Sequence, residues 1–523
     1  MRVRTALGAA VVGLWLIVVG MHVRREYFKS DALLLAEGAQ ALAPGSYFYA
    51  VELNGRVIGV ASSRLDTVPE GFLFEDALRL EVPALNATHP ATVRTRARLG
   101  KALQLLDFDF QLTSEIGRFA VRGEAVGDSV LDLRMEAGGE GGSQTTRVRL
   151  DPSTTLPVAL PLRMAAAGRL EEGKEFSARI FDPSAMAHRA VSVKVTGRAM
   201  LVVPDSVAEV QGRGQGAGRS RWVTVRHRTV PTWVVEESYG GVVVTSWLDQ
   251  DGRLVKAESP MGFTLRRVPY ELAAQQWEED RADPRMAAGY GAVIENTAIA
   301  ANVDLDGLEG GVRGLVVRLG NVELEGFDLS GGRQELRGDT LLVRRERLDG
   351  VEAAYALPYR GGGAPADELE ATPLIQATDP RIVATARSIA AGSTDPLEVA
   401  RRLNDWVYAN LRKDITLSIP SAAQVLEARQ GDCNEHTVLY VALARALGLP
   451  ARTAVGLVHI RGRFYYHAWP EIWAGEWVAV DPTLDQFPAD ATHLRFVTGG
   501  LARQVELIRL IGRLRIDIIG APE

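Results

Sequence analysis

Residues 429–448, RQGDCNEHTVLYVALARALG, contain the only cysteine of a 523-residue chain. Asp432 is a typical N-cap, so a helix is predicted to begin at Cys433, and Gly448 with Pro450 ends it. A lone thiol cannot form an intramolecular disulfide, and structural zinc sites usually need several cysteines. Two interpretations of Cys433 remain. It is either a small buried hydrophobe or a nucleophile whose thiolate is favoured by the first turn of a helix.

The sequence around this helix predicts an α+β domain. Asp379-Pro380 and Asp395-Pro396 each combine an N-cap with a proline at the first helical position, which predicts two helices. Ser421 and Gln424 form a predicted capping box for a short third helix. Strand-like runs follow the cysteine helix at 451–460, 464–473 and 477–482. Helices first and an antiparallel meander after them is an α+β arrangement.

A cysteine nucleophile needs a base, and the base needs a group that orients it. His467 lies in the second strand-like run and Asp481 lies near the end of the third. If 474–476 is the hairpin loop, Trp473 faces Trp477. His467 and Asp481 then lie on the same face as diagonal neighbours, roughly 7–8 Å apart between backbones. A two-residue loop would place them on opposite faces.

Three segments occur in order and carry these candidate residues: GDCNEH (431–436), YYHAWPEIW (465–473) and WVAVDPTLDQ (477–486). Together with GLPARTAVGL (448–457) they resemble the transglutaminase-like superfamily of cysteine enzymes. The resemblance covers roughly residues 370 to 500, under a third of the chain. It implies a papain-like α+β fold that uses neither a metal nor an organic cofactor.

The same resemblance implies a role for each member of a triad. Cys433 matches the nucleophile, His467 the general base and acid, and Asp481 the carboxylate that orients the histidine. In this family the thiolate attacks a carboxamide or peptide carbonyl, and an amine or water then resolves the thioester. Residues 1 to 369 match nothing in this family.

One departure from the animal enzymes leaves the oxyanion donor open. Those enzymes follow the nucleophile with a tryptophan and use another tryptophan upstream, whereas Asn434 follows Cys433 here. The Cys433 N–H is one expected donor. The candidates for the second are Gln424, Gln430 and Trp406.

Further residues near the triad are weaker candidates for substrate contacts. Glu435, Trp469 and Trp473 are proposed substrate-binding residues. The alternative for the tryptophans, together with Trp477, is a cross-strand core cluster. His436 lies three residues after the nucleophile, but we expect a packed, hydrogen-bonded histidine there and no metal site.

The composition and the N-terminal segment limit the classes of protein to which the chain can belong. A net charge of -6 and a pI near 5.9 give no reason to expect nucleic-acid binding. The uncharged run Thr5–Met21, flanked by arginines, is close to the lower limit of ~17 residues for a membrane span. We therefore expect an uncleaved signal anchor in residues 1–30 with the body outside the cytoplasm, in the periplasm. A cleaved signal peptide and a buried helix are the alternatives.

The predicted fold class is a multidomain chain with four parts. Residues 1–30 form the transmembrane helix, and residues 31–270 form a β-rich domain, either a half-barrel or a sandwich. Its hairpin signals include Asn54-Gly55. Residues 271–368 are a linker helix and a small β module, and residues 369–523 are the catalytic domain.

The predicted function is cysteine-dependent hydrolysis of amide or peptide bonds. Transglutaminase-type cross-linking is the second hypothesis. The third is a non-enzymatic envelope scaffold whose thiol domain is vestigial and whose β-rich parts bind a lipid or protein. The expected partners are a protein or peptide substrate, with peptidoglycan stem peptides and proteins both open, and a membrane through the N-terminal helix.

Overall fold

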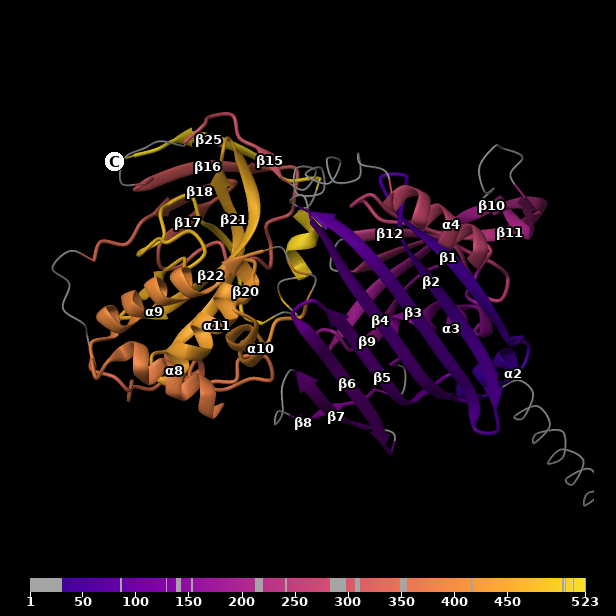
Figure 1. Ribbon diagram of the computed structural model, residues 1–523, viewed down its shortest axis with the longest axis horizontal. Helices are drawn as coiled ribbons and strands as arrows, with labels where there is room; N and C mark the ends of the chain where they lie inside the picture. The colour runs from indigo at the N-terminus through magenta and orange to yellow at the C-terminus, as the bar shows by residue number, and fades with distance from the viewer. Residues whose placement is uncertain are drawn as a thin grey trace, which may run out of the picture.

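The chain forms two bodies, a large twisted sheet and a mixed helix–sheet body, as a computed structural model shows (Figure 1). The first half of the chain builds the sheet, and the second half builds the mixed body. The structure describes residues 31–523 apart from 85–86, 128, 138–142, 152–153, 212–219, 240–241, 283–297, 306–310, 349–354, 415, 417, 501–502, 504, 511 and 523.

The first body is one continuous antiparallel sheet of 14 strands. Its order runs from β8 back to β1, and then from β14 back to β9, so β1 and β14 pair in the middle. The first hairpin turns at Asn54 and Gly55, whose φ angles of 50° and 80° are those that a tight two-residue turn requires. The strands are β1 Gly45–Leu53, β2 Arg56–Val68, β3 Gly71–Ala84, β4 Ala87–Gly100, β5 Leu105–Ser114, β6 Gly117–Val126, β7 Val130–Ala137, β8 Ser143–Arg149, β9 Glu175–Asp182, β10 Ala187–Gln211, β11 Ser220–Tyr239, β12 Val242–Leu248, β13 Leu254–Glu258 and β14 Phe263–Arg267.

Alternation along the strands gives this sheet one apolar and one charged face. On the apolar face, Phe72, Phe74 and Phe108 are buried in a cluster that includes residues of the helical segments. On the other face, arginines and carboxylates oppose each other across neighbouring strands, as at Arg96 and Asp109. The helices of this half are α2 Asp31–Ala39, α3 Leu160–Ala166 and α4 Tyr270–Arg281.

The predicted fold class is wrong. The protein is mostly β, with 49% of residues in strands and 20% in helices, and its β-rich part is a single extended sheet. Hairpin signals such as Asn54-Gly55 report only on pairs of adjacent strands. They cannot show that successive hairpins continue one sheet, because that depends on pairings between strands far apart in sequence, such as β1 with β14.

The predicted transmembrane helix and the periplasmic localisation derived from it are also corrected. Across the described part of the chain, every helix is too short or too polar to cross a membrane. The predicted anchor itself, residues 1–30, lies outside the described residues.

The second body combines helices with two antiparallel sheets, and a short parallel pair. The small β module predicted in 271–368 shares a sheet with β25 at the end of the chain, and its core is continuous with that of β21 and β22. The helices are α7 Ala364–Asp367, α8 Pro380–Ala390, α9 Pro396–Asn410, α10 Ala422–Ala428 and α11 Cys433–Ala446. The strands are β15 Ile299–Ala300, β16 Gly314–Gly320, β17 Gln334–Arg337, β18 Thr340–Arg344, β19 Arg412–Lys413, β20 Gln430–Gly431, β21 Ala451–Ile460, β22 Arg463–Trp473, β23 Trp477–Ala479, β24 Leu494–Thr498 and β25 Arg515–Gly520.

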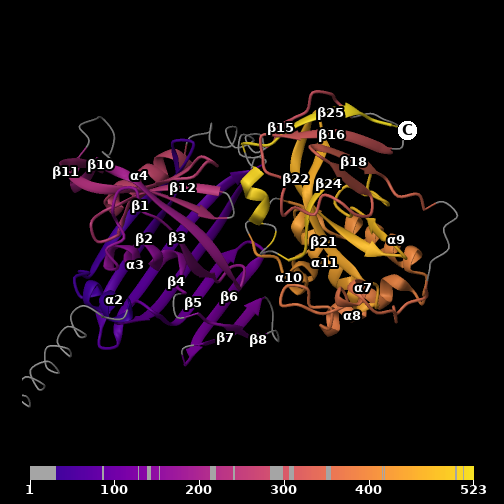
Figure 2. The same cartoon turned by 180° about the vertical axis from the view of Figure 1, so that it is seen from behind.

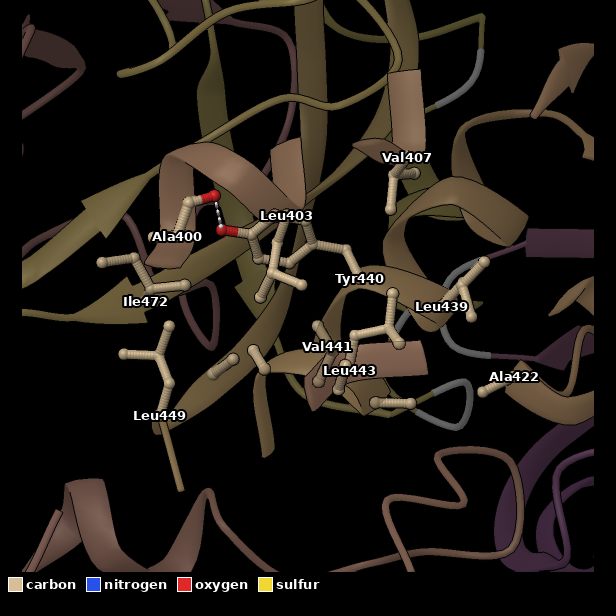
Figure 3. Packing of buried hydrophobic residues seen from close by; sticks show 14 of the residues in the cluster. Ala400, Leu403, Val407, Ala422, Leu439, Tyr440, Val441, Leu443, Leu449 and Ile472 are labelled. Atoms are coloured by element: carbon tan, nitrogen blue, oxygen red, sulfur yellow. Dashed lines mark hydrogen bonds between the residues drawn. The ribbon is translucent and has the colours of Figure 1, made fainter. Parts of the chain in front are cut away.

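Helix α11 forms the centre of this body and is buried along most of its length. Figure 3 shows Leu439 and Leu443 packed among side chains of α9 and α10. The hydroxyl of Tyr440 donates a 2.9 Å hydrogen bond to the carbonyl of Ala400 on α9, which satisfies the only polar atom of this buried ring. The start of α11 is therefore held by a packed core.

The two bodies are in direct contact beside α10. Ile419, 8% exposed, packs into the apolar cluster of the large sheet. Gln424 on α10 donates a 2.9 Å hydrogen bond from its amide to the carbonyl of Arg118 in the sheet. Both views show α10 on the side of the mixed body that faces the sheet (Figures 1 and 2).

A glycine at the middle of β21 allows β24 to approach closely. A Cβ on Gly456 would lie 1.9 Å from the carbonyl oxygen of Leu494, which is backbone and cannot rotate away. We expect Gly456→Ala to lower the free energy of unfolding by about 1–3 kcal/mol because it overpacks this contact. Urea denaturation of the full chain would measure the effect.

The matched control is Gly197→Ala on β10, where an added Cβ meets nothing within 4 Å. The urea concentration at the midpoint of unfolding should be the same for this variant as for the wild type, or slightly higher. Equal midpoints for both alanine variants would contradict the close approach of β24.

Candidate active site

The candidate nucleophile occupies the first position of α11, as the sequence predicts. The Asp432 carboxylate accepts a hydrogen bond from the Asn434 N–H at 2.8 Å, and the Glu435 carboxylate accepts one from the Asp432 N–H at 2.9 Å. This reciprocal cap fixes the backbone on both sides of Cys433. The Asp432 carboxyl group is thus engaged by a backbone donor, but burial and the neighbouring Glu435 still raise its pKa well above the usual value.

The Cys433 thiol faces the middle strand of the neighbouring sheet. Its sulfur accepts a hydrogen bond from the backbone N–H of Ala468 on β22. Burial raises the pKa of this thiol well above its usual value, and the nearby carboxylates, Asp432 foremost, raise it further. The resting thiol is therefore protonated near neutral pH, and a base must remove its proton.

His467 immediately precedes Ala468, so the candidate base and the N–H that holds the sulfur come from adjacent residues of β22. Its Nε2 lies 2.7 Å from Oδ2 of Asp481. With Nε2 donating to this carboxylate, Nδ1 is the ring nitrogen left to accept a proton. The contact follows from the hairpin register, since Trp473 faces Trp477 as predicted.

Asp481 is fully buried, and both of its oxygens are hydrogen-bonded. Oδ1 accepts bonds from the N–H groups of Thr483 and Leu484 at 2.7 and 3.0 Å. Burial would raise the pKa of Asp481, but the charge and hydrogen bond of His467, with those of His493, hold it well below its usual range. The carboxylate is therefore ionised near neutral pH.

His493 is the residue that the sequence analysis missed. Its Nε2 lies 2.9 Å from the same Oδ2 of Asp481, and its Nδ1 lies 3.3 Å from Oδ1 of Asp490. Burial would lower the pKa of His493, but the two carboxylates outweigh it and raise that pKa. No motif identifies this residue, because it reaches Asp481 only through the pairing of β24 with β21.

Within the described part of the chain, His467, Asp481 and His493 form the one cluster whose spacing would suit a metal ion. The nitrogen and oxygen atoms that would ligate it are instead hydrogen-bonded to one another at 2.7 and 2.9 Å. His436, three residues after the nucleophile, bonds through Nδ1 to the carbonyl of Asp432 at 2.7 Å. The observed geometry is thus that of a hydrogen-bond chain from His467 through Asp481 to His493.

The weaker substrate-binding candidates occupy three different environments. Glu435 is 1% exposed and accepts hydrogen bonds from Thr416 and Ser418, so it anchors the loop before α10. Trp469 is fully buried and stacks on His467, with ring centroids 6.1 Å apart. Trp473 pairs with Trp477, and six residues of strand, about 20 Å, separate it from His467.

Of the three candidates for the second oxyanion donor, Gln424 uses its amide N–H in a hydrogen bond, whereas Gln430 is bonded through its oxygen and Trp406 makes its contact through its ring face. Gln424 donates to the carbonyl of Arg118 in the large sheet. Gln430 accepts a hydrogen bond from the Arg412 guanidinium. Trp406 lies under the guanidinium of Arg429, 4.5 Å from its ring centroid. The second donor remains unassigned.

We expect His493→Gln to lower stability in a pH-dependent manner. The raised pKa of His493 gives stability that is complete below about pH 6.5 and fades as the pH rises through that raised pKa. The lowered pKa of Asp481 gives stability that is present above about pH 4 and is lost on further acidification. The free energy of unfolding of the variant should therefore be about 1–3 kcal/mol below that of the wild type between about pH 4 and about pH 6.5. The difference should be smaller at pH 9.

Thermal unfolding of the full chain at pH 5.5 and pH 9 would measure this difference. His227→Gln, at an exposed position of β11, is the matched control and should be neutral at both values. A loss of the same size at both pH values would show that His493 only packs.

Solved structures of three bacterial proteins show partial likeness to the chain. A protein described as a candidate cysteine protease from Cytophaga hutchinsonii is 16% identical over 39% of this chain and 82% of its own, with a TM-score of 0.28. The periplasmic domain of TgpA from Pseudomonas aeruginosa is 17% identical over 34% and 77%, with a TM-score of 0.23. A beta-barrel-like protein from Brucella abortus is 13% identical over 43% and 95%, with a TM-score of 0.29.

No curated protein matches the sequence. The family model of the transglutaminase-like superfamily matches residues 383–482, a segment that contains Cys433, His467 and Asp481 and ends before His493. This match agrees with the resemblance that the cysteine, histidine and aspartate segments indicated. Residues 383–482 of the chain are therefore a domain of the transglutaminase-like superfamily.

Proposed function

We propose that the domain hydrolyses amide or peptide bonds through a thioester on Cys433, with a protein or peptide as substrate. The observation that carries the proposal is the arrangement of β22. One residue of this strand binds the sulfur through its N–H, and the residue before it, His467, is hydrogen-bonded to Asp481. A scaffold with a vestigial thiol domain would have no need of this arrangement.

In the first half of the reaction, Nδ1 of His467 takes the thiol proton while the sulfur bonds to the carbonyl carbon. Asp481 stabilises the imidazolium that forms, because its carboxylate already accepts the Nε2 proton. The Cys433 N–H at the start of α11 is the proposed donor to the developing oxyanion. The C–N bond then breaks, and His467 returns the proton to the leaving amine.

In the second half, His467 takes a proton from water, and the resulting hydroxide attacks the thioester carbonyl. The C–S bond breaks, and the thiol recovers its proton from His467 as the free acid leaves. An amine in place of this water would give transamidation. The same residues serve both outcomes, and peptidoglycan stem peptides and proteins both remain candidate substrates.

We expect substitutions in the triad to abolish hydrolysis without unfolding the protein. Cys433→Ala should remove activity entirely, and Asp481→Asn should lower kcat by about 10²- to 10⁴-fold because it mispositions His467. The assay is release of new amino termini from fluorescent casein and from a synthetic stem peptide. Mass spectrometry should detect the thioester in the wild-type protein.

Trp473→Ala is the control, because this tryptophan lies about 20 Å along the strand from His467. Its kcat should stay within about threefold of wild type. Wild-type turnover that persists in Cys433→Ala would exclude the thioester route. Addition of an amine such as putrescine would show whether transamidation competes with hydrolysis.

A further inference from the structure

A small pocket of about 210 Å³ lies at the junction of the two bodies, beside the start of α11. One wall is the turn between β9 and β10 of the large sheet, with Ala185 and Met186. The opposite wall is α11, with Asn434 and Thr437. The large sheet thus contributes part of the surface next to the candidate nucleophile.

The residues that follow Cys433 on α11 line the pocket. Asn434 follows the nucleophile directly, and Thr437 lies four residues later, one helical turn or about 5.4 Å along the axis. A side chain attached next to an attacked carbonyl extends over a similar distance. The residue that carries this carbonyl is therefore the one whose side chain would enter the pocket.

The lining defines what the pocket would accept. None of the residues that line it carries a charge, and Met186, Leu374 and Val438 supply apolar surface. A charged side chain would lose its hydration there without gaining a partner. Thr437 is fully buried, and its hydroxyl has no hydrogen-bond partner among the described residues. An unsatisfied buried hydroxyl of this kind is costly unless a ligand completes it.

Hydrogen bonds and an ion pair hold the β9–β10 turn of the large sheet in place. Oδ1 of Asp182 accepts hydrogen bonds from the backbone N–H and the hydroxyl of Ser184 at 3.0 and 2.6 Å, which closes the turn. The other oxygen of Asp182 pairs with Arg189 at 2.9 Å. Ile419 and Gln424 fix the neighbouring contact between the bodies. The pocket therefore exists before a substrate binds.

We propose that this pocket is a substrate subsite for a neutral, aliphatic side chain on the residue whose carbonyl is attacked. The β9–β10 turn of the large sheet is then a specificity-determining element. This proposal rests on the proposed function, because it needs Cys433 to react with a carbonyl or an analogous electrophile.

Peptidyl chloromethyl ketones test the proposal without knowledge of the natural substrate. In this reaction the sulfur bonds to the methylene carbon, chloride leaves, and the thiol proton passes to His467 or solvent. Probes that end in glycine, leucine or aspartate would be compared by their rate of inactivation of the full chain. Iodoacetamide, which has no such side chain, gives the reference rate.

In the wild-type protein the leucyl probe should react at least about tenfold faster than the glycyl probe after correction for their rates with free thiol. The aspartyl probe should be the slowest. Ala185→Trp should remove the leucine preference by filling the pocket, while its iodoacetamide rate stays at the wild-type value. Ala190→Trp, exposed on β10 and outside the lining, should keep the preference.

Thr437→Val keeps the shape of the side chain and removes an unsatisfied hydroxyl, so it should fold even if Ala185→Trp does not. Its preference for the leucyl over the glycyl probe should stay within about threefold of the wild-type value, because the apolar lining of the pocket is unchanged. Equal leucyl and glycyl rates in the wild type, or a leucine preference that survives Ala185→Trp, would overturn the subsite.

Failure of the proposed function gives a different result. In that case the iodoacetamide rate itself would be the same in the wild type and in His467→Ala. A wild-type iodoacetamide rate that depends on His467, combined with no side-chain preference, would retain the enzyme and reject the pocket.

Discussion

The site depends on the hydrogen bonds that stabilise the buried carboxylate of Asp481. An ionised carboxylate without partners would be very costly in a packed interior. Here one oxygen accepts two backbone N–H groups, and the other lies between the imidazoles of His467 and His493. These contacts keep the group charged and fix the position of the His467 ring. Removal of any one of them would leave part of a buried charge uncompensated.

The rest of the fold brings these contacts together from separate elements. The packed core around α11 fixes Cys433, the β21–β22–β23 meander fixes His467 and Asp481, and β24 brings in His493. Gly456 allows β24 to bring His493 to the site, because a side chain at this position would push β24 away. The large sheet contributes a further wall through the β9–β10 turn. Residues of both bodies thus line a pocket next to the first turns of α11.

Local signals predicted much of the site, and long-range pairings explain what they missed. Side chains cap α8, α9 and α10 at Asp379, Asp395 and Ser421, as expected. The three-residue loop of the hairpin placed His467 and Asp481 in contact, because register alone decides which face each side chain takes. The 14-stranded sheet, the pairing of β25 with β16 and the position of His493 were not predictable, since each depends on strands distant in sequence. For the same reason, no local signal indicated that a turn of the first half shares a pocket with Asn434 and Thr437 of α11.

The most direct test of the account is the pH dependence of Cys433 alkylation in the wild type and in His467→Ala. The chain has one cysteine, so the measured rate belongs to one sulfur. Burial raises the pKa of this thiol, so without His467 its reaction must wait for ionisation at high pH. The account predicts that near pH 7 the wild type reacts at least about tenfold faster than His467→Ala, and that the two rates converge in alkali. Identical rates at every pH would mean that His467 does not activate Cys433, and the proposed enzyme would have to be abandoned.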